Sequence, residues 1–152
     1  MNKIKLICIS LLAIFFSFCK NNNDLNPSKK MKNPVGFFEI LALDIDQSVL
    51  FYKNVFGFEF TKQNIDGNEM AFFSDNSESS GIVGALAKGA TYKPSKTGTL
   101  IYFNTENIDQ TLVDIQKNGG KILYPKTSIG DLGFVAEFED IAGNKVALHQ
   151  NK

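Results

Sequence analysis

Two stretches of the chain repeat nearly the same pattern of apolar and polar positions. LDIDQSVLFYKNVFG occupies residues 43–57, and ENIDQTLVDIQKNGG occupies residues 106–120. Apolar side chains recur in both at intervals of three or four residues, which is the spacing of an amphipathic helix. The sequence therefore predicts two helices of one design. Their apolar stripes are Ile45, Val49, Tyr52 and Phe56 in the first copy, and Ile108, Leu112 and Ile115 in the second.

The two predicted helices also share their start and stop signals. Asp44 and Asn107 can each cap a helix by accepting a hydrogen bond from a backbone N–H of the first turn. Each has a glutamine three residues further on, as in a capping box. Gly57 and the pair Gly119–Gly120 follow the stripes, and glycine readily adopts the left-handed conformation that ends a helix.

Runs of β-branched and aromatic residues flank both helices and predict β-strands. One strand precedes each helix and three follow it, so each half of the chain is a strand–helix–three-strand module. The first module spans 34–87, the second spans 99–150, and the segment 88–98 connects them. The predicted strands are 36–43, 58–63, 69–74 and 82–87, followed by 99–104, 121–127, 132–139 and 145–150.

A module of about 60 residues with one helix cannot bury both faces of its sheet. Two such modules can pair, so that their curved mixed sheets enclose a shared cavity. We therefore predict an α+β fold of two βαβββ modules, with a binding cavity between them.

The first 33 residues follow another pattern. Two lysines precede the apolar run 6–18, Cys19 follows directly, and a polar run comes next. Residues 1–18 have the layout of a signal peptide, and an apolar run that ends at a cysteine resembles a bacterial lipoprotein signal. The resemblance implies that Cys19 is lipidated and that 19–33 tether the domain to a membrane of the cell envelope. The alternatives are an uncleaved N-terminal anchor, and a cytoplasmic protein whose translation starts at Met31.

The composition of the domain excludes cysteine chemistry and argues against nucleic-acid or strongly anionic ligands. Both cysteines, Cys8 and Cys19, lie in the leader, so the domain has no thiol nucleophile, disulfide or cysteine metal ligand. Residues 34–152 carry ten lysines and fifteen acidic residues, a net charge of −5, and the chain has no arginine. Such a domain is a poor nucleic-acid binder, and it lacks the residue best suited to clamping carboxylates or phosphates. A neutral, partly aromatic ligand better suits a chain that is rich in phenylalanine, with fourteen in total.

The first helix and the end of the chain carry a resemblance to a known family. The motif D-x-x-x-S-x-x-F-Y-x-x-V-F-G is present as DIDQSVLFYKNVFG (44–57), and the closing segment is EFEDIAGNKVAL (137–148). Both are similar to segments of the vicinal oxygen chelate superfamily, which includes glyoxalase I, bleomycin-resistance proteins and extradiol dioxygenases. The resemblance covers residues 34–150 and implies the paired-module fold, but it specifies neither a substrate nor a reaction.

Family members that use a metal take His, Gln or Glu ligands from strands of both modules. In this chain, the residues at the positions that correspond to the family's metal ligands cannot bind a metal. They are Phe37, Leu100, Gly84 or Ala85, and Ala147. His149 is the single histidine, so one chain cannot assemble a three-histidine zinc site or a two-histidine, one-carboxylate iron site. We therefore predict no cofactor and no tight catalytic metal.

Strand alternation predicts which side chains face the cavity. The family's ligand position implies that the face bearing Phe37 is the cavity face. Three polar side chains then point inward as candidate catalytic groups, namely Glu39, Tyr102 and His149. Simpler interpretations are a solvated edge carboxylate, a core tyrosine, and a histidine in a frayed terminus. The other predicted lining residues are Phe37, Leu41, Leu100, Asn104 and Ala147.

Three functions are compatible with these residues. The first is an envelope-anchored, metal-free protein that binds a small, largely apolar molecule. The second is a metal-independent isomerase or lyase in which Glu39 is the base and Tyr102 donates to the developing oxyanion. The third is a conventional metal-dependent enzyme similar to lactoylglutathione lyase. A homodimer is compatible with each, and no nucleic-acid partner is expected.

Overall fold

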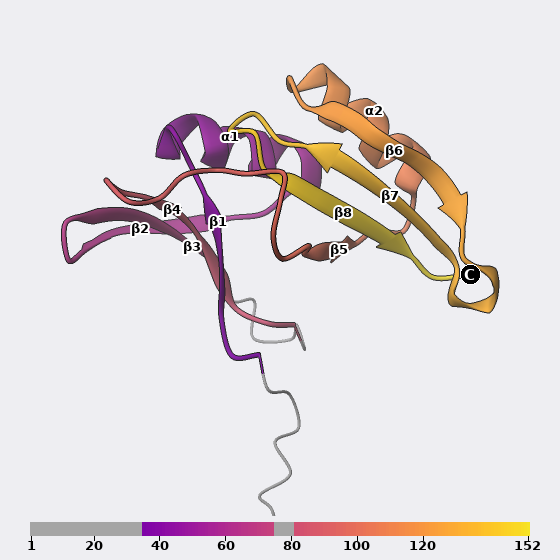
Figure 1. Cartoon of the computed structure of the whole chain (residues 1–152), viewed down its shortest axis with the longest axis horizontal. Helices are drawn as coiled ribbons and strands as arrows, with labels where there is room; N and C mark the ends of the chain where they lie inside the picture. The colour runs from indigo at the N-terminus through magenta and orange to yellow at the C-terminus, as the bar shows by residue number, and fades with distance from the viewer. Residues whose placement is uncertain (1–34, 75–80) are drawn as a thin grey trace, which may run out of the picture. The chain divides into compact units, whose positions relative to one another are not determined.

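In the part of the chain that the structure describes, eight strands and two α-helices follow the predicted order (Figure 1). The computed structural model describes residues 35–74 and 81–152, which belong to the compact unit Val35–Lys152. The elements are β1 (Phe38–Leu41), α1 (Ile45–Phe56), β2 (Phe60–Ile65), β3 (Asn68–Phe73), β4 (Gly84–Lys88), β5 (Tyr102–Asn104), α2 (Ile108–Lys117), β6 (Lys121–Ser128), the 3-10 turn η1 (Gly130–Leu132), β7 (Phe134–Glu139) and β8 (Lys145–Gln150).

Membrane attachment is predicted from residues outside the described ranges. The signal peptide, Cys19 and the tether all precede residue 35. Of the helices in the described ranges, α1 with 12 residues and α2 with 10, neither is long and apolar enough to cross a membrane.

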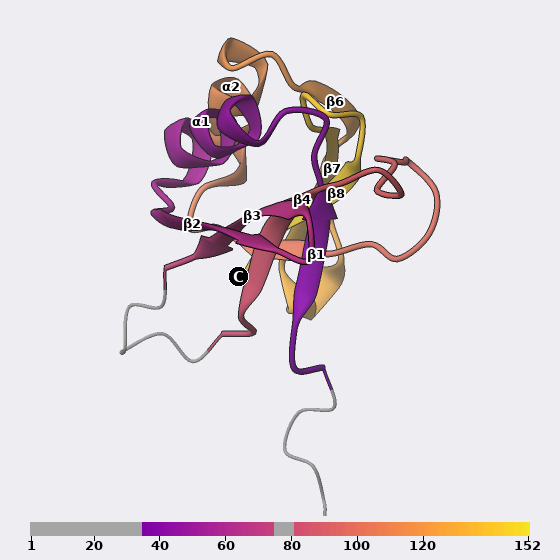
Figure 2. The same cartoon turned by 90° about the vertical axis from the view of Figure 1, so that its left-hand side faces the viewer.

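Each module forms its own four-stranded mixed sheet. The strand order is β1-β4-β3-β2 in the first sheet and β5-β8-β7-β6 in the second. The strand that precedes each helix pairs in parallel, β1 with β4 and β5 with β8, and the other neighbours are antiparallel. α1 packs on β3 and β4, and α2 packs on the second sheet (Figure 2). The structure thus confirms the predicted α+β fold of two βαβββ modules.

Both predicted helix caps are present. The side chains of Asp44 and Asn107 accept hydrogen bonds from first-turn N–H groups at 3.0 and 3.1 Å. α1 ends at Gly57, whose φ of 72° is the left-handed conformation expected of a C-terminal glycine. α2 ends one residue earlier than predicted from its glycines, because Asn118 is the cap and Gly119, with φ of 94°, comes after it.

Five strands begin two or three residues later than predicted, namely β1, β2, β4, β5 and β7. β5 starts at Tyr102 rather than at residue 99, and β7 starts at Phe134 rather than at residue 132. For β7 the cause is a turn. Gly133 has a φ of 101°, which interrupts the extended backbone and separates Leu132 from the strand.

The core between helices and sheets is rich in aromatic rings that join the two modules. Phe103 of the second module contacts Phe38 and Phe56 of the first, with ring centroids 6.2 and 5.2 Å apart. Tyr52 is fully buried, 6.0 Å from the Phe103 ring. Rings at these separations stabilise one another beyond the area they bury. The phenylalanine content is therefore explained by the core, and by itself it does not indicate an aromatic ligand.

Candidate functional site

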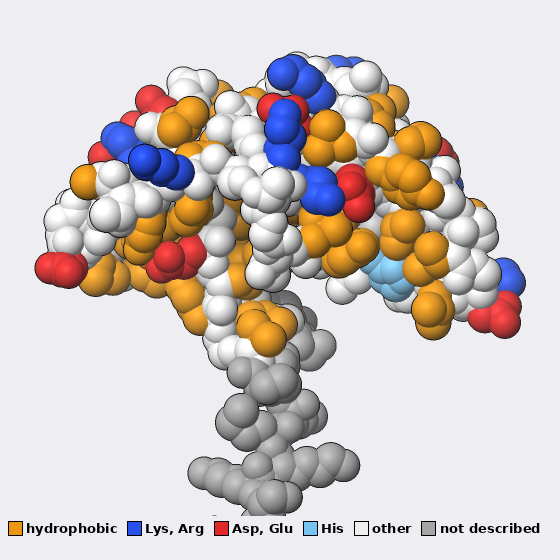
Figure 3. Space-filling view, in the orientation of Figure 1, with side chains coloured by type: hydrophobic (Ala, Val, Ile, Leu, Met, Phe, Trp, Pro, Cys, Tyr) orange, Lys and Arg blue, Asp and Glu red, His pale blue; other side chains and the backbone are white. Residues whose placement is uncertain are grey.

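The helices cover one face of each sheet, and we call the opposite side the helix-free face. Glu39 and Leu41 of β1 lie on it, opposite Ala85 and Ala87 of β4. The intervening Ile40 points into the core. Hydrophobic side chains reach the surface beneath the sheets, on the side away from the helices (Figure 3). Alternation along β1 therefore puts Glu39 and Leu41 on one face of the sheet, and the shared cavity that they are expected to line stays a prediction.

The helix-free face of the first sheet has an apolar floor. Met70, Ala85 and Ala87 are buried there, and Leu41 and Phe72 pack against them. Phe37 lies beside this floor, with its ring centroid 6.0 Å from that of Phe72, and it is 42% exposed. An apolar surface with an accessible aromatic edge suits contact with an apolar molecule.

Tyr92, from the segment 88–98 that connects the modules, packs against the same floor. The negative charge of the Glu39 carboxylate raises the pKa of Tyr92, and burial and a hydrogen bond to Glu39 raise it further. The phenol therefore remains a proton donor beside a carboxylate. The sequence pattern did not single out Tyr92, because 88–98 has the composition of a connector. Tyr92 is the one aromatic residue of that segment, and this is the only sequence feature that could have marked it as a site residue.

Four predicted residues share the helix-free face of the second sheet. Tyr102 lies opposite Ala147, and Asn104 lies opposite His149, in the register of β5 and β8. Tyr102 is 50% exposed and Ala147 is buried. Leu100 precedes β5 and is half-buried. The second module therefore presents a phenol, an amide and an imidazole on one side.

Glu39 and Tyr102 occupy corresponding positions in the two modules. Each precedes its helix cap by five residues, and each lies opposite an alanine, Ala85 or Ala147. The two side chains belong to different sheets. The hydroxyl beside Glu39 is that of Tyr92 rather than that of Tyr102.

His149 is held in an ordered strand. It pairs with Asn104 on one side and with Val135 on the other, so the interpretation as a residue of a frayed terminus is wrong. Its Nε2 lies 2.8 Å from the Leu132 carbonyl oxygen, and a carbonyl accepts only, so Nε2 carries the proton and donates. The pale-blue side chain in Figure 3 belongs to the single histidine of the sequence, and it reaches the surface in that view.

The residues at the family's ligand positions do not fit a metal. Of the two candidates on β4, Ala85 faces the helix-free side. Gly84 faces the core, where an added Cβ would lie 2.5 Å from the Phe38 ring. The four side chains have no donor atom for a metal. They are Phe37, Leu100, Ala85 and Ala147. Across residues 35–74 and 81–152, no group of three His, Cys, Asp or Glu residues could hold a metal ion.

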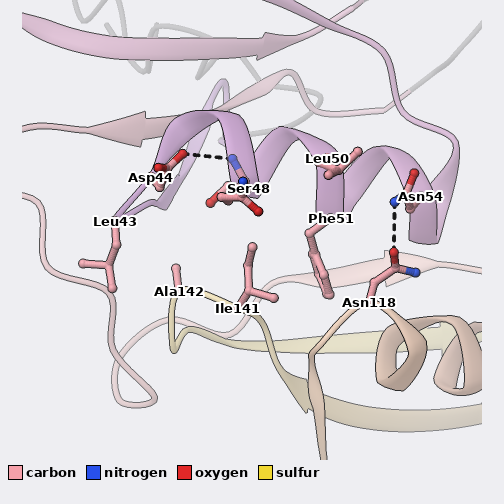
Figure 4. A pocket seen from close by; sticks show the side chains of 10 residues that line it. Leu43, Asp44, Ser48, Leu50, Phe51, Asn54, Asn118, Ile141 and Ala142 are labelled. Carbon is pink, nitrogen blue, oxygen red and sulfur yellow. Dashed lines mark hydrogen bonds between the residues drawn. The ribbon is translucent and has the colours of Figure 1, made fainter.

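A pocket of about 350 Å³ lies on the helix side, between α1 and the turn that joins β7 to β8 (Figure 4). Phe51 of α1 and Ile141 of the turn line it from opposite sides. None of the residues predicted to line a cavity contributes to it. The lining consists of Leu43, Asp44, Gln47, Ser48, Leu50, Phe51, Asn54, Asn118, Ile141 and Ala142.

The paired modules and their capped helices define a glyoxalase-like protein. Residues 35–148 match the family model of the Glyoxalase/Bleomycin resistance protein/Dioxygenase superfamily. The chain belongs to this family, and the resemblance inferred from its sequence motifs is confirmed.

Known relatives agree with this assignment. A "Glyoxylase-like domain-containing protein" of Didymella fabae is 28% identical over 114 residues, which cover 72% of this chain and 88% of that protein. The glyoxalase I of Leishmania major is 23% identical with a TM-score of 0.62, covering 78% of this chain and 86% of that one. FosX, a fosfomycin resistance protein of Listeria monocytogenes, is 17% identical with a TM-score of 0.62, covering 80% and 94%. At such identities the solved structures establish the fold alone.

Proposed function

We propose that this protein binds a small, largely apolar molecule on its helix-free face, without the metal that metal-dependent members of the family use. The observation that carries the proposal is the set of side chains at the ligand positions, which are Phe37, Leu100, Ala85 and Ala147. These side chains can contact an apolar ligand, but they cannot coordinate a metal. Removing apolar surface from water against them stabilises a complex by about 25 cal/mol per Å².

The polar groups around the floor support the same function. Small-molecule sites are commonly apolar surfaces with a few polar groups that fix the orientation of the ligand. The first sheet carries the Glu39 carboxylate, whose charge raises the pKa of Tyr92, and the second carries Tyr102 and Asn104, which are exposed. The chain has no arginine for a bidentate clamp, so a ligand without a strong anionic group fits best.

We propose further that the domain is attached to the cell envelope through a lipid on Cys19. The support is the sequence layout, in which an apolar run ends at this cysteine and a polar run follows. The polar run would link the lipidated cysteine to the domain and hold the domain near the membrane surface.

Fluorescence titration with Nile red, a neutral apolar dye, tests the binding site. We expect saturable binding to the purified full-length protein, and Phe37→Ala weakens it roughly tenfold, about 1.4 kcal/mol. Val113→Ala is the matched control, because Val113 is also 42% exposed but belongs to α2. An equal loss in both variants, or no saturable binding, would overturn the proposed location.

A metal-independent isomerase or lyase is the second candidate, favoured by the pair of Glu39 and Tyr92. The Glu39 carboxylate would take a proton from a carbon next to a carbonyl, and the electron pair would move onto the carbonyl oxygen. A phenol would donate to that oxygen, and the proton would return to a neighbouring carbon. Without a metal to polarise the carbonyl this chemistry is demanding, so binding ranks first.

A further inference from the structure

The helix-side pocket is separate from the proposed binding face and has the dimensions of a ligand site. Its volume of about 350 Å³ falls within the range of small-molecule sites, roughly 300–1,000 Å³. Its apolar walls come from the first module through α1 and from the second through the β7–β8 turn. They are Leu43, Leu50, Phe51, Ile141 and Ala142.

Ser48 is the one buried polar residue among those that line this pocket. It is only 3% exposed, and its hydroxyl has no hydrogen-bond partner among the described residues. Every fully enclosed side-chain oxygen or nitrogen of the described residues has a hydrogen-bond partner. Since the Ser48 oxygen has none, it is not fully enclosed. The hydroxyl therefore opens into the pocket that Ser48 lines.

The second copy of the repeat shows that this arrangement is specific to Ser48. Thr111 holds the corresponding position on α2. Its hydroxyl donates to the Asn107 carbonyl at 2.9 Å and lies 2.8 Å from the Thr105 hydroxyl. Thr111 is thus satisfied within its own module, whereas the Ser48 hydroxyl has no partner among the described residues. A ligand group in the pocket would supply the missing partner of Ser48.

Among the other polar groups of the pocket, Asp44 and Asn54 have free acceptors, and the side-chain amide of Gln47 can both donate and accept. One carboxylate oxygen of Asp44 accepts from the Gln47 N–H at 3.0 Å, which leaves its second oxygen for a ligand. The amide nitrogen of Asn54 donates to Asn118 at 2.9 Å, which leaves the Asn54 carbonyl oxygen. No lysine lines the pocket. These acceptors call for a ligand that donates.

The charge of the ligand depends on two opposing effects at the start of α1. The amino end of a helix carries a partial positive charge that favours anions. The full negative charge of Asp44 already lies there, and it outweighs that partial charge. The Lys88 ammonium donates to Glu69 at 2.5 Å, and this hydrogen bond raises the pKa of Lys88, with a smaller contribution from the charge of Asp44. The field inside the pocket therefore favours a cation.

We propose that this pocket binds a primary amine on a short hydrocarbon chain. The ammonium would donate to Asp44 and Ser48, which lie one helical turn apart on the same side of α1. The hydrocarbon would pack between Phe51 and Ile141. Binding here uses groups from both modules, and it requires nothing of the helix-free face.

An NMR titration of the full-length protein with n-hexylamine tests the proposal. We expect saturable amide shifts centred on residues 43–54 and 141–142. Hexanoate has the same chain length with the opposite charge, and it binds at least tenfold more weakly. Equal affinity for hexanoate, or shifts centred on the helix-free face, would overturn the proposal.

Three variants sharpen the test. Asp44→Asn keeps a helix cap, because asparagine caps as well as aspartate, and it weakens hexylamine binding at least tenfold. Ser48→Ala weakens it about threefold. Asp46→Asn is the control, since it removes the same charge from the same helical turn outside the pocket, where Asp46 pairs with Lys62, and it changes affinity less than twofold. A loss in Asp46→Asn equal to that in Asp44→Asn would show unspecific attraction and reject the site.

Discussion

Tyr52 of the first module donates a hydrogen bond to Asp140 of the second, with 2.9 Å between the two oxygens and both side chains buried. The side-chain nitrogen of Asn144 donates to the same carboxylate at 2.9 Å and to the Leu41 carbonyl at 2.7 Å. The second carboxylate oxygen accepts from the N–H groups of Ala142 and Asn144. One buried carboxylate therefore connects α1, the end of β1 and the β7–β8 turn.

Removing the Tyr52 hydroxyl should destabilise the fold without emptying the core. Tyr52→Phe keeps the ring contacts but takes one donor from a buried carboxylate, and we expect the free energy of unfolding to fall by about 2 kcal/mol. Urea denaturation measures this difference. Tyr124→Phe is the control, because Tyr124 is 43% exposed, and it should change stability by less than about 0.5 kcal/mol. Equal effects would mean that the bond to Asp140 contributes nothing.

The same tyrosine predicts a loss of stability in alkali. Burial, followed by the charge of Asp140 and the hydrogen bond to it, raises the pKa of Tyr52 well above its ordinary 10.0. Above pH 10 the unfolded chain releases this proton while the folded chain retains it. Stability therefore falls as the pH rises, by up to about 1.4 kcal/mol per pH unit from this group.

Urea denaturation at neutral pH and near pH 11 tests this dependence. The other titrating groups are common to the wild type and Tyr52→Phe, so their contributions cancel in the comparison. We expect the wild type to lose more stability than the variant over this interval. Parallel losses in the two proteins would contradict the raised pKa of Tyr52.

The fold could be predicted from the sequence because its signals are local. A cap, an apolar stripe and a stop recur within about 14 residues in each module, and such short-range patterns determine helices directly. Asp44 and Asn107 cap the helices as predicted. Alternation along β1 likewise places Glu39 on the helix-free face.

The candidate sites could be predicted only in part, because they depend on contacts distant in sequence. Tyr92 reaches Glu39 from a connector whose path no periodicity describes. The helix-side pocket forms because the turn at Ile141 meets α1, almost a hundred residues away in the chain. Ser48 and Thr111 hold the same position in the repeat, but the hydroxyl of Thr111 has nearby partners in Asn107 and Thr105, whereas Ala42 stands where the first module would need a threonine.

Elemental analysis tests the absence of the family's metal. We expect purified full-length protein to carry no stoichiometric Zn, Ni, Fe or Mn. Alanine and phenylalanine side chains supply no ligand, and added EDTA should change neither stability nor Nile red binding. Close to one transition metal per chain or per dimer would favour the metal-dependent alternative.

Cell fractionation tests the proposed lipid anchor. The full-length protein should appear in the membrane fraction, and Cys19→Ala should move it out, because the acylation site is lost. Cys8→Ala is the matched control, since it removes the other cysteine of the leader and should leave the distribution unchanged. A Cys19→Ala protein that stays in the membrane fraction would favour the uncleaved anchor.

Proton exchange distinguishes binding from catalysis at Glu39. An aryl ketone with exchangeable α-hydrogens, such as 1-indanone, is incubated with the protein in deuterium oxide and followed by mass spectrometry. If the helix-free face only binds, deuterium enters no faster than in buffer, and Glu39→Gln changes Nile red affinity by less than roughly tenfold. If Glu39 is a base, the wild type accelerates exchange, and Glu39→Gln lowers the rate by ~10²–10⁴.

Glu59→Gln is the control, because Glu59 pairs with Lys53 at 2.8 Å on the exposed surface. Suppose that the wild type and Glu59→Gln both accelerate exchange and Glu39→Gln does not. That result would overturn the pure binding function and favour the isomerase or lyase.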